Sequence, residues 1–196
     1  MRQIWEEEAN KAIRAIKNEE WAKAEIHLKK VYRFSDAPIS VGYNLAKVLG
    51  YQNKDKQAQK ILENILAKEP GYFNACYECG ICFLKLGQFV NSFKMFQKAL
   101  VIKETDVDSQ VMVARLAQRI GKYETAKQYW HILMSHNKYK NEAYLGIMRA
   151  RLELNEENAI NDLVNLYKNE SEIWPLLKMA TRSSKGAIPL KLHQAR

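Results

Sequence analysis

Glycine and proline are scarce in this sequence, which contains 8 Gly and 4 Pro among 196 residues. An all-β fold needs many turns and therefore many turn-forming residues, so this composition argues against one. Long helices joined by few turns account for it better. The remaining composition, 47% hydrophobic and 27% charged, is typical of a globular domain. The sequence therefore predicts an all-α protein.

Long apolar runs are also missing. The N-terminal stretch is charged from Arg2 onward and lacks the apolar region of a signal peptide. No stretch approaches the roughly 18–20 apolar residues that cross a bilayer. We therefore expect no membrane span and a cytoplasmic location, where disulfides are rare.

Cysteine is limited to Cys76, Cys79 and Cys82, spaced by three in the stretch ACYECGICF. This spacing is half of a zinc or iron–sulfur signature, and His131 is the only plausible fourth ligand. A straight helix does not bring three such thiols together, because each step of three rotates by about 300°. We interpret Cys76 and Cys79 as core residues and place Cys82 at the rim of the buried face. Metal binding, or redox sensing by Cys82, stays as the alternative.

The net charge of +9 permits acidic partners or nucleic acid. Residues 181–196 hold four basic residues and no acid, and the other excess positive charge is spread over the rest of the chain.

A 34-residue repeat organises the chain. Residues that tolerate a left-handed backbone recur at this step as Asn53, Gly87, Gly121 and Asn155, and Glu19 holds the same phase one period earlier. Within each 34-residue period, two other positions hold small or apolar residues, and one more position holds a large apolar residue. Each period therefore predicts two closely packed helices joined by a turn. These three sets are Ala12, Ala46, Gly80, Ala114 and Met148; Ala24, Ala58, Ser92, Ala126 and Ile160; and Leu28, Leu62, Phe96, Trp130 and Val164.

The third period carries a family resemblance. It matches the tetratricopeptide repeat (TPR) pattern W-x2-L-G-x2-Y…A-x3-F as Cys76-x2-Cys79-Gly80-x2-Phe83…Ser92-x3-Phe96. The sequence thus resembles the TPR family, which implies an all-α, right-handed superhelical α-α solenoid of about five helix hairpins. We expect a single solenoid over 1–182, with repeats near 5–38, 39–72, 73–106, 107–140 and 141–174, a C-terminal capping helix at about 172–182, and a basic tail, 183–196, that is mobile unless it docks.

The resemblance also implies a binding site. In TPR proteins the first helix of each repeat lines a concave groove that holds a segment of a partner protein. Early positions of these helices are acidic here and late ones basic, so we expect a basic band that binds an acidic segment; complementarity to the helix dipoles is the alternative explanation. The groove positions carried over are Tyr43, Asn44, Lys47, Tyr51, Tyr77, Glu78, Ile81, Lys85, Met112, Arg115, Arg119 and Arg149.

Catalytic motifs are missing from the sequence: it has no glycine-rich phosphate loop, no G-x-S-x-G and no H-E-x-x-H. We therefore expect a non-enzymatic protein-interaction module, a scaffold, adaptor or assembly chaperone, without a cofactor or a bound metal. Two alternatives stay open. One is an RNA-binding helical repeat, disfavoured by the 34-residue period and the acids in the groove. The other is a self-assembling scaffold whose tail docks on a neighbouring copy.

Overall fold

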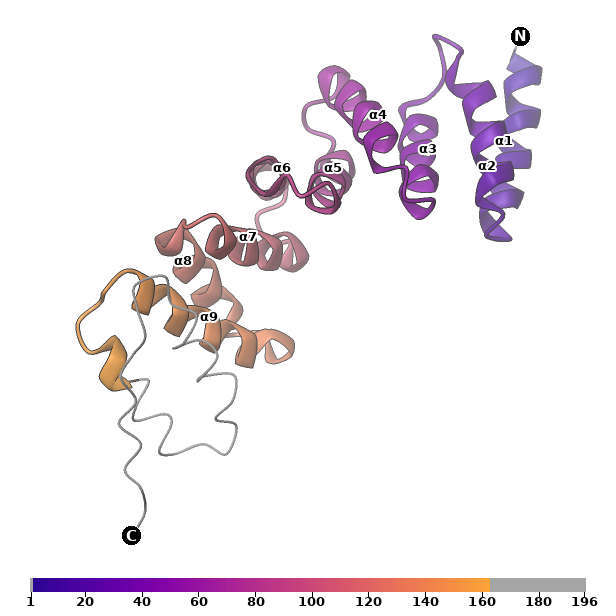
Figure 1. Ribbon diagram of the computed structural model, residues 1–196. Coiled ribbons are helices and arrows are strands. Elements are labelled where there is room, and N and C mark those ends of the chain that lie inside the picture. The colour runs from indigo at the N-terminus through magenta and orange to yellow at the C-terminus, as the bar shows by residue number, and fades with distance from the viewer. Residues whose placement is uncertain (1, 163–196) are drawn as a thin grey trace. The chain divides into compact units, whose positions relative to one another are not determined.

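The structure is a computed structural model that describes residues 2–162, and within them every regular element is helical (Figure 1). The predicted second helix of the fifth repeat is described only at its start, residues 159–162, and the capping helix and the tail lie outside the described residues. The elements are α1 (Arg2–Lys17), α2 (Trp21–Tyr32), α3 (Ile39–Tyr51), α4 (Asp55–Lys68), α5 (Phe73–Lys85), α6 (Phe89–Ile102), α7 (Val107–Arg119), α8 (Tyr123–Leu133), the short 3₁₀-helix η1 (Asn137–Tyr139) and α9 (Lys140–Glu153).

The turns inside the hairpins lie where the 34-residue phase predicts them. Asn53, Gly87, Gly121, Asn155 and Glu19 all have positive φ, between 52° and 78°. After each of them, the next backbone N–H donates to the carbonyl five residues earlier, as Lys54 N does to Leu49 O at 2.9 Å. This is a Schellman cap, which ends the helix by satisfying one of its last carbonyls. The prediction of the turn positions is confirmed, including the unusual Glu19.

Close packing of the two helices of a hairpin is clearest in the third repeat. The Ser92 hydroxyl donates to the carbonyl oxygen of Gly80 at 2.8 Å, and both residues are buried. The Phe96 ring covers Gly80 so tightly that a Cβ there would come within 2.8 Å of it. The small residues at two phases therefore let α5 and α6 approach, and the large residue at the next phase fills the remaining space, as predicted.

The chain divides into two compact units, residues 1–109 and 110–196. In the first unit α1 packs on α2, α3 on α4 and α5 on α6, and the hairpins are joined by α2 against α3 and α4 against α5. In the second unit α8 packs on α9, and the buried Trp130 ring lies against Gly146. The first unit therefore consists of consecutive stacked helix hairpins.

A buried carboxylate joins the first two hairpins. Glu25 on α2 is 7% exposed. It accepts hydrogen bonds from Lys29 Nζ at 2.6 Å, Lys54 Nζ at 2.6 Å and Gln52 Nε2 at 2.9 Å. Burial by itself raises the pKa of this carboxyl, but the three hydrogen bonds outweigh it and lower the pKa to about 2. Glu25 is therefore ionised and fixes the contact between α2 and the α3–α4 turn.

None of the helices between residues 2 and 162 is both long enough and apolar enough to cross a bilayer.

Candidate functional site

Lys47 is the centre of the predicted site in the first unit. It lies on α3 one turn away from both Tyr43 and Tyr51, and its ammonium is 5.9 Å from the centre of each ring. Glu78, on α5 of the next hairpin, places a carboxylate oxygen 3.3 Å from the ammonium. Burial lowers the pKa of Lys47, but Glu78 and the two tyrosines outweigh it, so the pKa is raised and the lysine stays charged.

Two further aromatic residues extend this cluster. Trp21, the first residue of α2, stacks on Tyr51 with ring centres 4.5 Å apart. Tyr72, just before α5, meets Tyr43 edge-on at 5.7 Å. Tyr51 is 56% exposed, and Asn44, about two turns earlier on α3, is exposed as well, so this helix presents an aromatic ring and an amide to the surface. Trp21 and Tyr72 are not among the predicted site residues, because both lie outside the first helices of the repeats.

The predicted site residues of α5 contact neighbouring helices instead of being fully exposed. Tyr77 packs edge-on against the buried Phe96 ring at 5.3 Å, and Ile81 is half-buried. The Lys85 ammonium donates to the carbonyl oxygen of Gly50 at 3.1 Å and lies 3.3 Å from the Asp55 carboxylate. Lys85 therefore links its own hairpin to the turn of the preceding one.

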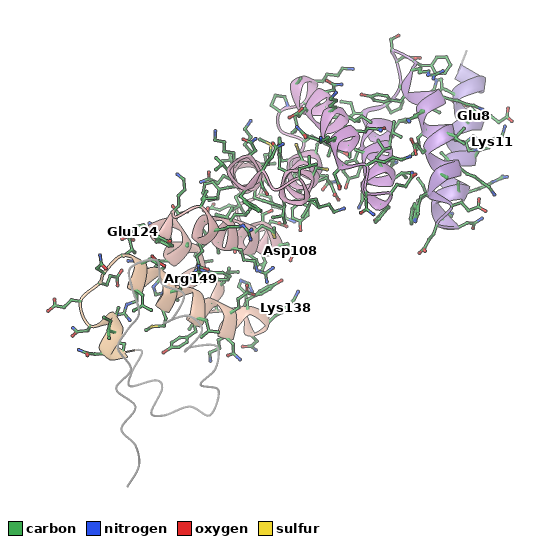
Figure 2. The ribbon with its side chains drawn as sticks, viewed as in Figure 1. Glu8, Lys11, Asp108, Glu124, Lys138 and Arg149 are labelled. Carbon is green, nitrogen blue, oxygen red and sulfur yellow. The ribbon has the colours of Figure 1, made fainter. Side chains whose placement is uncertain are left out.

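The second unit contains Met112, Arg115, Arg119 and Arg149. The Arg115 guanidinium binds Glu142 of α9 through two hydrogen bonds, Nε at 2.6 Å and Nη2 at 2.7 Å. These bonds raise the pKa of Arg115. Arg119 and Arg149 are exposed and Met112 is half-buried; Arg149 projects from α9 in Figure 2.

The acidic and basic positions of the first helices therefore have a third explanation that sequence reasoning did not consider. Lys47 pairs with Glu78 and Arg115 with Glu142, so in each case a late base on one first helix meets an early acid on the next first helix. Lys85 is also paired, with Asp55. The expected basic band is therefore largely neutralised at these three positions, because its charges hold consecutive hairpins together.

The cysteines belong to the core. Cys76 and Cys79 are fully buried, which confirms their predicted role, but Cys82 is only 5% exposed, so its predicted place at the rim is wrong. The reason is that α5 packs against both α4 and α6, which widens its buried face beyond that of one hairpin. Burial raises the pKa of Cys79 and Cys82 to about 12 and that of Cys76 less strongly. Over residues 2–162, no three His, Cys, Asp or Glu side chains are placed to hold a metal ion.

No protein-family profile matches this sequence. Among solved structures, a MamA protein has a TM-score of 0.73 at 14% identity, over 96% of this chain and 99% of its own. MamA AMB-1 has a TM-score of 0.71 at 13% identity, over 90% of this chain and 99% of its own. A tetratricopeptide repeat protein from Parabacteroides merdae ATCC 43184 has a TM-score of 0.70 at 15% identity, over 90% of this chain and 71% of its own. At these identities the likeness concerns the fold, and the chain has the TPR-like fold that the repeat predicts.

Proposed function

We propose that this protein is a non-enzymatic interaction module, a scaffold, adaptor or assembly chaperone, that binds a segment of a partner protein on its first helices. The TPR-like fold and the aromatic–lysine cluster of α3, in which Tyr51 is exposed, support this function. Tyrosine and tryptophan, which dominate this cluster, are enriched in binding hot spots. The three unpaired, buried thiols suit a reducing compartment, and we propose the cytoplasm.

The contacts of Lys47 indicate what the partner segment offers. Tyr51 and Asn44 are exposed and available, whereas the charge of Lys47 is already used by Glu78. A carboxylate of an acidic segment therefore reaches Lys47 by displacing the Glu78 side chain, which is 25% exposed. Apolar and aromatic side chains of the same segment pack on Tyr51.

In the second unit, Arg119 and Arg149 are exposed and form a further candidate contact. Arg115 reaches an acidic segment only by exchanging its two hydrogen bonds to Glu142. The acidic partner is thus in competition with the protein's own carboxylates at both positions.

This competition defines the test. The intact protein is immobilised, captured proteins are identified by mass spectrometry, and capture is compared between the wild type and the variants Glu78→Gln, Lys47→Gln and Tyr51→Ala. Glu78→Gln removes the competing carboxylate and should increase capture, while Lys47→Gln and Tyr51→Ala should reduce it.

Matched controls are Glu157→Gln and Lys140→Gln, which make the same charge changes at exposed positions of the second unit. Capture that is the same for all five variants would rule out the α3 cluster as the binding surface. Reduced capture by Glu78→Gln would rule out an acidic segment.

A further inference from the structure

The outward faces of the second helices in the first unit form a surface of nearly one sign of charge. The exposed residues within α2, α4 and α6 include only one acid, Glu63, and the exposed cap residues include the base Arg33 and two acids, Glu20 and Glu69. Six exposed cations have no ion-pair partner among residues 2–162, and we call them the outer basic surface: Arg33, Lys56, Lys60, Lys68, Lys94 and Lys98.

The repeat places these cations on one side of the unit. The exposed positions of α6 are those of α4 shifted by 34 residues, so Lys94 is the repeat equivalent of Lys60. Equivalent positions of stacked hairpins face the same way. The equivalent face of α8, in the second unit, exposes Glu124 and no lysine or arginine. The positive surface therefore belongs to the second helices of the first unit and does not recur on α8.

Aliphatic side chains lie among the cations. Val90, Val101 and Ile26 are 52%, 87% and 57% exposed. On α6, Val90 lies one turn from Lys94 and Val101 lies one turn from Lys98, so each valine is flanked by a charge. No aromatic side chain is exposed on α2, α4 or α6.

This composition distinguishes between two kinds of polyanion. Proteins that bind single-stranded nucleic acid stack bases on aromatic side chains, and base recognition in duplexes relies strongly on arginine. A lipid surface instead needs basic residues at the phosphates and aliphatic residues at the acyl boundary. We propose that the outer basic surface docks on an anionic lipid bilayer, with its lysines at the headgroups and Val90 and Val101 entering the interface.

This proposal concerns the second helices and is independent of partner binding on the first helices. The full-length protein is mixed with vesicles of phosphatidylcholine alone or of phosphatidylcholine with phosphatidylserine, and the bound fraction is measured by co-sedimentation at low and high salt. Each lysine near an anionic surface raises the affinity for that surface about fivefold. We therefore expect binding only to vesicles with phosphatidylserine, loss at high salt, and at least a tenfold loss in Lys94→Glu/Lys98→Glu.

The matched control is Lys17→Glu/Lys140→Glu, which changes the net charge equally at exposed lysines outside the outer basic surface. It should keep most of the binding, and Val101→Ser should weaken binding without changing its salt dependence. Circular dichroism confirms that each variant is folded. Three results overturn the proposal: no preference for phosphatidylserine, an equal loss in the control, or binding to a duplex or single-stranded oligonucleotide without binding to vesicles.

Discussion

Replacing Gly80 with alanine tests whether the close approach of α5 and α6 is what this glycine provides. The added Cβ would lie 2.8 Å, 2.9 Å and 3.0 Å from three carbon atoms of the Phe96 ring. Ordinary carbon–carbon contacts are about 3.5–4.0 Å, so the ring or the helix must move by roughly half an ångström or more. The ring has little freedom because it is fully buried and packs edge-on against Tyr77.

Two opposing terms set the size of the effect. Overpacking a core costs about 1–3 kcal/mol. Alanine gains up to about 1 kcal/mol over glycine in the interior of a helix. The clash is larger, so Gly80→Ala should lower the free energy of unfolding by about 1–2 kcal/mol.

Gly50 supplies the matched control. It also lies in a first helix, α3, but a Cβ there meets no atom within 4 Å. Gly50→Ala should therefore raise the free energy of unfolding by about 0.5 kcal/mol. Both variants are measured by urea denaturation followed by far-UV circular dichroism. Phe96→Leu in the Gly80→Ala background makes room for the methyl group and should cost less than Phe96→Leu alone. A Gly80→Ala variant as stable as the wild type, or a change of both alanine variants in the same direction, would contradict the close packing at Gly80.

Three further predictions concern other parts of the fold. Gly146→Ala brings a Cβ against Trp130 Nε1, a tighter clash than at Gly80, and should lower the free energy of unfolding by about 2–4 kcal/mol in the same urea assay; a smaller loss than for Gly80→Ala contradicts the packing seen at Trp130. The pKa of Glu25 is about 2 in the folded protein and about 4.3 in the unfolded chain. The ionised carboxylate therefore stabilises the folded state fully above about pH 5, and this stabilisation is lost as the pH falls toward 2. Glu25→Gln should therefore lower the free energy of unfolding by about 2–3 kcal/mol near neutral pH and by much less near pH 2, and a difference that does not change with pH refutes the ionic role. The three buried thiols should react with a chromogenic disulfide reagent only slowly in the native protein and completely in denaturant, because burial raises their pKa; rapid reaction of Cys82 in the native state would show that it is accessible.

The turns were predictable from the sequence because their backbone restricts residue choice. A positive φ favours Gly or Asn, and the same demand returns every 34 residues at Asn53, Gly87, Gly121 and Asn155. Helix packing was predictable for the same reason, since even a Cβ at Gly80 would clash with Phe96, and Ser92 is fully buried and bonded to the Gly80 carbonyl. Backbone geometry and close contacts thus leave a periodic trace in the sequence.

Contacts between hairpins leave no such trace. Lys47 meets Glu78 thirty-one positions later, whereas Arg115 meets Glu142 twenty-seven positions later, so the pairs have no common spacing to detect. The burial of Cys82 likewise depends on a second neighbouring helix, which the periodicity of α5 by itself does not reveal. The stacking of Trp21 on Tyr51 joins two hairpins through residues at helix ends. Each of these features depends on how one hairpin meets the next.

Whether a cation is paired with a carboxylate decides how far from the surface its positive charge acts. A cation that is paired with a carboxylate forms a dipole, whose field falls off quickly, whereas unpaired cations add to a field that extends over the surface. Lys47, Lys85 and Arg115 are of the first kind, because each forms an ion pair that joins two hairpins. The cations of the outer basic surface are of the second kind. Among residues 2–162, the second helices of the first unit therefore carry a concentration of cations that attract an anionic partner at long range, while Lys47, Lys85 and Arg115 on the first helices offer exchangeable contacts at short range.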